Sequence, residues 1–140
     1  MNTIVPDKFI RKEIYDRIHN MDINGTMFKC FDTRTTASNQ NFYTILSTQL
    51  NQPLPNKCGN GWENSTEIQV ITRYSKNVGS RVMLDDAVNE VIEELSEFSL
   101  PSTTGLKVNE QQLSIDNEIV NTERGEVVYT KVIRLQTTIN

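Results

Sequence analysis

Hydrophobic residues recur every three or four positions in two stretches of the chain, which predicts two amphipathic helices. In the first, over residues 8–21, Ile10, Ile14 and Ile18 fall on one stripe. Asp7 precedes this stretch, where its carboxylate can cap the first turn. The second stretch covers residues 81–98, and its stripe consists of Leu84, Val88, Val91, Leu95 and Phe98, with Ile92 alongside. Each helix therefore needs an apolar surface to cover.

Alternation of apolar and polar residues predicts five strands elsewhere in the chain. They are expected at 26–32 (TMFKCFD), 41–50 (NFYTILSTQL), 65–74 (STEIQVITRY), 108–121 (VNEQQLSIDNEIVN) and 126–139 (EVVYTKVIRLQTTI). A polar loop is expected at 33–41. A long turn or flap is expected at 51–61, which contains two prolines and two glycines. The last two strands form a hairpin that turns at Gly125.

The predicted order is helix, three strands, helix, two strands, within a single domain over residues 1–140. Two amphipathic helices can both bury their stripes against one sheet. The fold class is therefore predicted to be α+β, with a mostly antiparallel five-stranded sheet and both helices packed on one face.

Composition and charge exclude several classes of protein. Hydrophobic residues make up 36% of the 140 residues, which is typical of a folded domain. The net charge of −4 argues against an electrostatic nucleic-acid binder. No stretch reaches the roughly 20 apolar residues of a membrane helix. The N-terminus lacks the apolar core of a signal peptide, so synthesis in the cytoplasm is expected.

Candidate catalytic residues are few. His19 is the single histidine and lies at the end of the first helix, which favours a structural role. Cys58 lies in the segment CGNGW with Trp62, and no base is near it in sequence. Cys30 and Cys58 are 28 residues apart and are expected to be free thiols. Histidines at metal-ligand spacing are absent, so no catalytic site, metal or cofactor is expected.

The two predicted helices differ in charge. The second carries Asp85, Asp86, Glu90, Glu93, Glu94 and Glu97 against Arg81 alone. Such a row is most simply a solvated face, and the alternative is an acidic surface that meets a basic partner or lines a channel that must not hold DNA. In the first helix the cations outnumber the anions and include Lys8, Arg11, Lys12 and Arg17. One subunit can therefore present unlike surfaces to its neighbours.

The order of these elements resembles that of the tail-terminator and tail-completion proteins of tailed bacteriophages. The resemblance runs from about residue 10 to 138. It includes the aromatic strand NFYTIL, a flap with glycine and tryptophan, and a hairpin that ends in VVYTKVIRLQT. Its densest part is 61–95, GWENSTEIQVITRYSKNVGSRVMLDDAVNEVIEEL. These motifs consist of patterning and aromatic positions, with no catalytic fingerprint. The acidic second helix and the Asn-rich loops depart from the family's pattern.

The resemblance implies a non-enzymatic virion protein. Members of the family form rings, usually of six copies, at the head–tail junction. There they terminate the tail tube and join it to the head connector, and DNA passes through without sequence-specific binding. The expected partners are other copies of the chain, the tail tube protein and the neck proteins. The expected location is the neck of the virion, after assembly in the host cytoplasm.

Subunit and tube contacts are expected in the polar loops and on the charged helices. The loop 33–41, the flap 52–63 and the hairpin turn 123–126 are the expected contact segments. The candidate interface residues are Arg34, Asn60, Trp62, Glu63, Glu123, Arg124, Glu90, Glu93, Glu94, Arg11 and Arg17. Trp62 is either an anchor for a neighbour or a core residue. Two other functions remain open, a small adaptor or chaperone-like binding module and an enzyme that uses Cys58.

Overall fold

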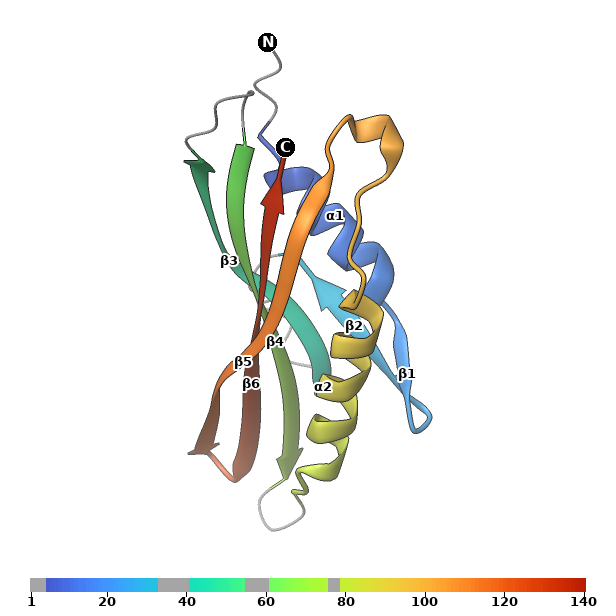
Figure 1. Cartoon of the computed structure of the whole chain (residues 1–140). Helices are drawn as coiled ribbons and strands as arrows, with labels where there is room; N and C mark the ends of the chain where they lie inside the picture. Colours follow the sequence, from blue (N-terminus) through green and yellow to red (C-terminus); the bar gives the residue numbers. More distant parts are fainter. Residues whose placement is uncertain (1–4, 33–40, 55–60, 76–78) are drawn as a thin grey trace.

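The computed structural model describes residues 5–32, 41–54, 61–75 and 79–140. Its elements in chain order are α1 (Asp7–Ile18), β1 (Met21–Ile23), β2 (Thr26–Phe31), β3 (Phe42–Leu54), β4 (Gly61–Ser75), α2 (Val82–Leu95), the short 3-10 turn η1 (Ser102–Thr104), β5 (Val108–Glu123) and β6 (Glu126–Ile139). The two helices lie side by side in the hollow of one sheet, which curls around them like half a barrel (Figure 1). The α+β class is therefore confirmed.

The predicted five-stranded, mostly antiparallel sheet is wrong. The described residues form a six-stranded mixed sheet in the order β1-β2-β3-β4-β6-β5. β6 lies between β4 and β5, because the last strand of the chain returns from the hairpin turn to pair along the whole of β4. The predicted closing hairpin is confirmed, and it turns at Arg124 and Gly125, both with positive φ.

The additional strand is β1, which forms where the first helix was predicted to continue. α1 ends at Ile18, and Asn20 takes a left-handed φ of 63° that turns the chain back into the sheet. A two-residue turn at Asn24 and Gly25, with φ of 52° and 88°, then joins β1 to β2. Asn-Gly is the strongest sequence signal for such a hairpin. Met21 therefore belongs to the hairpin rather than to the helix.

The sheet is mixed because β2 and β3 pair in parallel, from Lys29 opposite Tyr43 to Phe31 opposite Ile45. Parallel pairing requires the chain to return to the starting end of the first strand before the second one begins. Turn signals do not reveal strand direction, so the polar loop was equally compatible with an antiparallel hairpin.

Both helices pack on one face of the sheet, as predicted. Ile10, Ile14 and Ile18 of α1 are fully buried. They share one core with the α2 stripe and with inward-facing strand residues. The strand residues of this core include Phe28, Cys30, Leu46, Ile68, Val70, Ile133, Leu135 and Ile139. The predicted stripe of the second helix is buried, and Phe98 joins the core from beyond the end of the helix.

The proline-containing segment after residue 50 is a strand over part of its predicted loop. β3 continues to Leu54 and β4 already begins at Gly61, so that Pro53 lies opposite Trp62 and Leu54 opposite Gly61. A proline is tolerated there because β2 pairs with β3 only near Tyr43 to Ile45. Beyond that point β3 is an edge strand among the described residues, and edge strands accept proline. The predicted flap is therefore shorter than expected, and residues 55–60 lie outside the described residues.

Candidate interaction surface

The N-terminal end of α1 is attached to the sheet by buried polar groups. Asn64 and Thr66 of β4 are buried, and the Thr66 hydroxyl donates to Asn64 Oδ1 at 2.8 Å. Gln49 of β3 donates from Nε2 to the Asp7 carbonyl oxygen at 3.1 Å and accepts from Arg11 at Oε1, also at 3.1 Å. Asp7 is the first residue of α1, and its carboxylate makes no capping hydrogen bond, contrary to the prediction. These contacts fix α1 beside β3.

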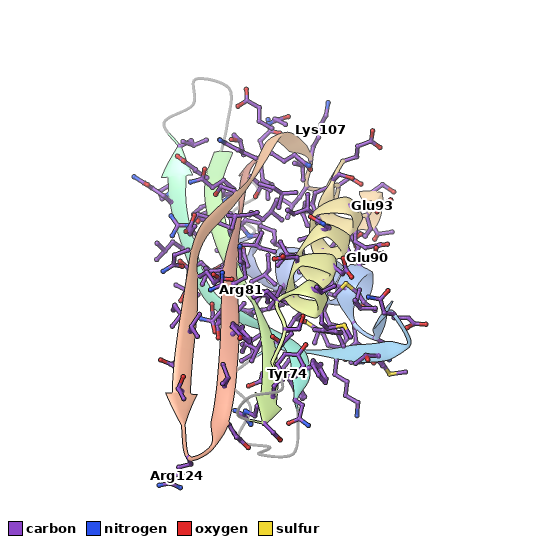
Figure 2. The ribbon with its side chains drawn as sticks, turned by 90° about the horizontal axis from the view of Figure 1, so that it is seen from below. Tyr74, Arg81, Glu90, Glu93, Lys107 and Arg124 are labelled. Atoms are coloured by element: carbon purple, nitrogen blue, oxygen red, sulfur yellow. The ribbon has the colours of Figure 1, made fainter. Side chains whose placement is uncertain are left out.

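The acidic residues of α2 point in several directions. Glu93 and Glu94 are exposed, whereas Glu90 and Asp86 are half-buried. Asp86 Oδ2 accepts from Asn24 Nδ2 at 2.8 Å, so this side of α2 faces the β1–β2 turn of its own chain. Burial, helped by a hydrogen bond with Glu94 and by the neighbouring carboxylates, raises the pKa of Glu90. Glu90 and Glu93 follow one another along α2 (Figure 2).

The lysines and arginines of α1 differ in their contacts and in their exposure. Arg17 Nη1 donates to the Glu94 carbonyl oxygen at 3.1 Å, and its guanidinium lies 5.1 Å from the ring centroid of Phe98. Arg17, an expected interface residue, thus binds the end of α2 within its own chain. Arg11 contacts Asp32 at 3.4 Å and remains 40% exposed. Lys8 and Lys12 are exposed and line one hollow together with Arg11.

We call the sheet face opposite the helices the helix-free face. It is polar around Arg134, and elsewhere it carries a buried apolar cluster of Tyr43, Ile45 and Ile71, with Phe31 and Val128 packed against it. Arg134 lies at the centre of this face and contacts both Glu67 and Asp116 at 2.9 Å. Arg73 is paired with Glu126 at 3.5 Å. An open depression of about 450 Å³ occupies this face, lined by Leu50, Asn51, Gln52, Glu63, Ser65, Arg134 and Gln136. Amides and hydroxyls dominate it, and its arginine is neutralised by the two carboxylates.

The candidate residues of the loops and turns do not form one cluster. Trp62 and Glu63 begin β4, and Trp62 is half-buried opposite Ile139. Arg124 occupies the hairpin tip and projects away from the rest of the chain (Figure 2). The tip pairs next to Ser75 at the other end of β4. Trp62 and Arg124 are therefore separated by the length of the strand, roughly 40 Å at 3.3 Å per residue.

Three expected contact residues cannot be placed fully. Arg34 and Asn60 lie outside the described residues, as do most of the loop 33–41 and the middle of the flap. Glu123 is placed by its backbone, at the end of β5.

The candidate catalytic residues have structural contacts. His19 was expected inside the last turn of the first helix and instead directly follows α1 as its C-cap. Its ring stacks on Tyr15 with ring centroids 4.3 Å apart, and its Nδ1 accepts a hydrogen bond from the Cys30 backbone N–H at 3.1 Å. Cys30 is a buried free thiol, and burial raises its pKa to about 11. Cys58 lies outside the described residues. In the part of the chain that is described, His, Cys, Asp and Glu side chains do not gather into a group that could hold a metal.

Two sheet edges were missed by the sequence reasoning. β5 pairs with β6 on one side, and its other side has no strand partner among residues 5–32, 41–54, 61–75 and 79–140. The same holds for β3 from Gln49 to Leu54. Exposed apolar side chains are found on both strands, at Leu50 of β3 and at Ile115, Ile119 and Val120 of β5. In the sequence, the two prolines at 53 and 55 predicted a turn and so gave no signal that the strand continues to Leu54.

Comparisons with known proteins give a match in structure and none in sequence. No protein-family model matches the sequence, and a search of the curated proteins gives no significant match. Among solved structures, the fold is similar to that of a chain in the virion of a native gene transfer agent particle. The TM-score is 0.64 at 14% sequence identity, and the match covers 97% of this chain and 99% of the other. Such a likeness establishes a shared fold. Within the described residues no helix is long and apolar enough to cross a membrane.

Proposed function

We propose that this chain is a structural virion protein that forms a ring at the head–tail junction of a tailed phage or phage-like particle. The ring terminates the tail tube and joins it to the head connector. The observation that carries the proposal is the fold shared, over nearly the whole of both chains, with a chain of a gene transfer agent virion. The proposed position at the head–tail junction rests on the tail-terminator resemblance of the sequence.

The surfaces are compatible with a ring and with a passage for DNA. A ring requires a heterologous interface, in which two different patches of the subunit meet. The acidic residues of α2 and the exposed lysines of α1 supply unlike patches. The helix-free face carries carboxylates, and its arginines 73 and 134 are paired with them. A face of this kind repels the DNA backbone and holds no particular sequence.

The partners that follow from this proposal are further copies of the chain, six in a closed ring, with the tail tube protein below and the neck or connector proteins above. The chain acts through surface complementarity, without a catalytic step. Assembly takes place in the host cytoplasm, and the final location is the virion neck.

The first test is the mass of the purified full-length protein, measured by light scattering with negative-stain images of the same sample. A closed ring of six times the chain mass is expected. A monomer or dimer at all concentrations would instead support the second candidate, a small adaptor or chaperone-like module, which is favoured by the half-buried aromatic and apolar residues at the strand ends.

The second test is charge reversal on α2. Replacing Glu90, Glu93 and Glu94 by lysine gives α2 three cations. In the proposed ring these would face the lysines and arginines of α1 in the neighbouring copy. If the acidic helix faces that neighbour, the ring dissociates at low salt, because like charges then meet across the interface. An unchanged mass would show that α2 faces solvent in the ring.

A further inference from the structure

In the half of the sheet that contains the chain's C-terminus, neither edge has a strand partner among the described residues. There the order of strands is β3-β4-β6-β5, which Figure 1 shows from left to right at its upper end. β2 pairs with β3 at residues 43–45 alone, so β3 has one described strand neighbour from Gln49 to Leu54, and α1 contacts it there through Gln49. β5 has one described strand neighbour, β6, along its whole length, and the Gln111 side chain forms hydrogen bonds at the end of α2. Unpaired edges of this kind are templates for a further strand.

The two edges lie at the same level of the sheet. The register forms continuous cross-strand rows, of which one consists of Leu50, Ser65, Gln136 and Gln112. This row points to the helix-free face, since Ser65, Gln136 and Leu50 line the depression there. Each edge strand also has a stretch that contains no β-bulge. In β5 it runs over residues 110–115 between two bulges, and in β3 over residues 49–54 after one.

The directions of the strands are compatible with pairing. β3, β4, β6 and β5 are each antiparallel to the next strand, so β3 and β5 run in opposite directions. If the β5 edge of one copy met the β3 edge of another with the faces aligned, the new pair would be antiparallel as well. The sheet would then continue from one copy into the next with its alternation unbroken.

The charges of the two edges are also compatible. β5 carries four acidic residues and no lysine or arginine. Asp116 and Glu118 are paired with Arg134 and Arg81 of the same chain, and Glu110 is the acidic residue of the stretch 110–115. Residues 46–54 of β3 are uncharged, and beside them lies Arg11, which shares a hollow with Lys8 and Lys12. Two β5 edges facing each other would bring the acidic residues together. Charge therefore favours β5 against β3 over β5 against β5.

We propose that the β5 edge of one copy pairs with residues 49–52 of β3 in a second copy of this chain, so that the subunits are joined head to tail by a continuous sheet. The inference rests on the proposed ring and names the contact that closes it. Pro53 sets the end of the pairing, because it offers no N–H to a ladder. The contact is heterologous, and it generates a ring when the rotation per copy closes.

Disulfide crosslinking tests this contact directly. The full-length protein with Cys58→Ser receives Leu50→Cys and Gln112→Cys, one at each end of the same row. Within one chain these positions are three strand spacings apart, about 14 Å. A disulfide needs Cα atoms about 4.4 to 6.8 Å apart, so it can form only between copies. Mild oxidation should give a ladder of covalent oligomers on a non-reducing gel, up to the size of the ring.

The single-cysteine variants distinguish a β5–β3 contact from a contact between two identical edges. Leu50→Cys alone and Gln112→Cys alone should stay monomeric on the gel, and a mixture of the two should give dimers. Because the register between copies can shift by two residues, Glu110→Cys and Ser114→Cys, which share the face of Gln112, are tested with Leu50→Cys as well. The control pair is Met27→Cys with Gln112→Cys. Met27 is 58% exposed, close to the 66% of Leu50, but it lies on β2.

The outcomes separate this inference from the proposed function. The contact is supported if the Leu50 pairs give a ladder and the Met27 pair gives at least about tenfold less crosslinked product. Such a difference would mean that the cysteines at 50 and 112 of neighbouring copies are held at a high local concentration. A ring of the expected mass without a ladder overturns the strand pairing and leaves the ring proposal intact. Dimers from Gln112→Cys alone would show a β5–β5 contact and overturn it too. A monomeric protein overturns both proposals.

Discussion

Arg17 binds the carbonyl oxygen of Glu94 at 3.1 Å and thereby joins the end of α1 to the end of α2. The last turn of a helix has carbonyl groups without intrahelical partners and a partial negative charge, so a guanidinium is favourable there. The same side chain pairs with Glu13 at 2.9 Å and lies over Phe98. One residue thus links the ends of the two helices.

Replacing Arg17 by alanine should lower the free energy of unfolding by about 1–2 kcal/mol, because a charge-assisted hydrogen bond and a cation–π contact are lost. Urea unfolding followed by circular dichroism measures the change. Lys12→Ala is the control, since its ion pair with Asp16 is exposed and should contribute little to stability. Equal effects of the two substitutions would mean that the contact between the helices does not stabilise the fold.

Glu90→Gln should stabilise the subunit slightly at neutral pH. The folded chain raises the pKa of Glu90 through burial and through its neighbours Glu94 and Glu93. For an acid with a raised pKa, the stabilising contribution is present below the ordinary value of 4.5 and is lost as the pH rises through the raised value. The variant should therefore exceed the wild type by about a few tenths of a kcal/mol at pH 7 and lose this advantage below pH 4.

The salt dependence of the Glu90→Gln effect tests whether charge is its cause. The gain at pH 7 should shrink in about 0.5 M salt, which screens exposed carboxylates. A gain that is independent of both salt and pH would point to helix propensity rather than to charge. Ser99→Ala, an exposed position beyond the helix, serves as a control for changes outside the acidic row.

The helices and the long strands could be predicted from the sequence, because their buried residues recur at the regular spacing of a helix or a strand. The alternation of Ile68 and Val70 and the stripe through Leu84 and Val91 were read correctly, since each depends on local spacing. Strand neighbours were not predictable in this way. Whether β2 lies parallel to β3, and whether β6 separates β4 from β5, depends on contacts between distant segments that no local pattern encodes.

The candidate interface residues stay predictions, and there is a physical reason why the sequence alone could not rank them. Surface residues contribute little to the hydrophobic pattern, so charge alone could not show that Arg17 is used within the chain while Lys8 and Lys12 remain exposed. The open edge of β3 was hidden because prolines usually end strands. At an edge, however, the missing N–H of Pro53 has no consequence for the ladder on the other side.

Replacing Asn64 should loosen the start of α1. Its side chain accepts from Thr66 at 2.8 Å and donates to Asn51 at 3.3 Å, in a fully buried position. Asn64→Ala removes an acceptor from a buried hydroxyl and should cost about 1–3 kcal/mol. Hydrogen exchange should increase at the amide of Ile10, which closes the first turn of α1 on Pro6. Ser65→Ala, next in the strand but on the helix-free face, should leave that amide protected.

Cys30 should make the fold sensitive to alkaline pH. Burial, the largest cause, raises the pKa of its thiol from 9.0 to about 11. The neutral thiol is thus favoured in the folded state, and its contribution is complete below pH 9 and lost as the pH rises towards 11. Two pKa units correspond to at most about 2–3 kcal/mol. The free energy of unfolding should fall over this range by more in the wild type than in Cys30→Ala, and parallel pH curves would contradict the assignment.

The same burial predicts slow chemistry at this thiol. Because the thiolate is the reactive form, Cys30 in a Cys58→Ser chain should react with an aromatic disulfide reagent at neutral pH far more slowly than it does in urea. Reactivity in the folded chain comparable to that of a free thiol would show that Cys30 is accessible.

Trp62→Ala distinguishes an assembly residue from a core residue. Trp62 lies half-buried at the start of β4, between Pro53 of β3 and Ile139 of β6. Loss of a fully buried tryptophan costs about 3–5 kcal/mol, whereas a half-exposed one at the end of a sheet should cost about 1–2 kcal/mol. We expect the variant to remain folded and to lose the ring at concentrations where the wild type is assembled. Ile139→Ala, which empties a fully buried position in the same row, is the matched control and should destabilise the subunit itself. If Trp62→Ala destabilises the isolated subunit as much as Ile139→Ala does, Trp62 belongs to the core, and the neighbour must be held by the sheet edges and the helices instead.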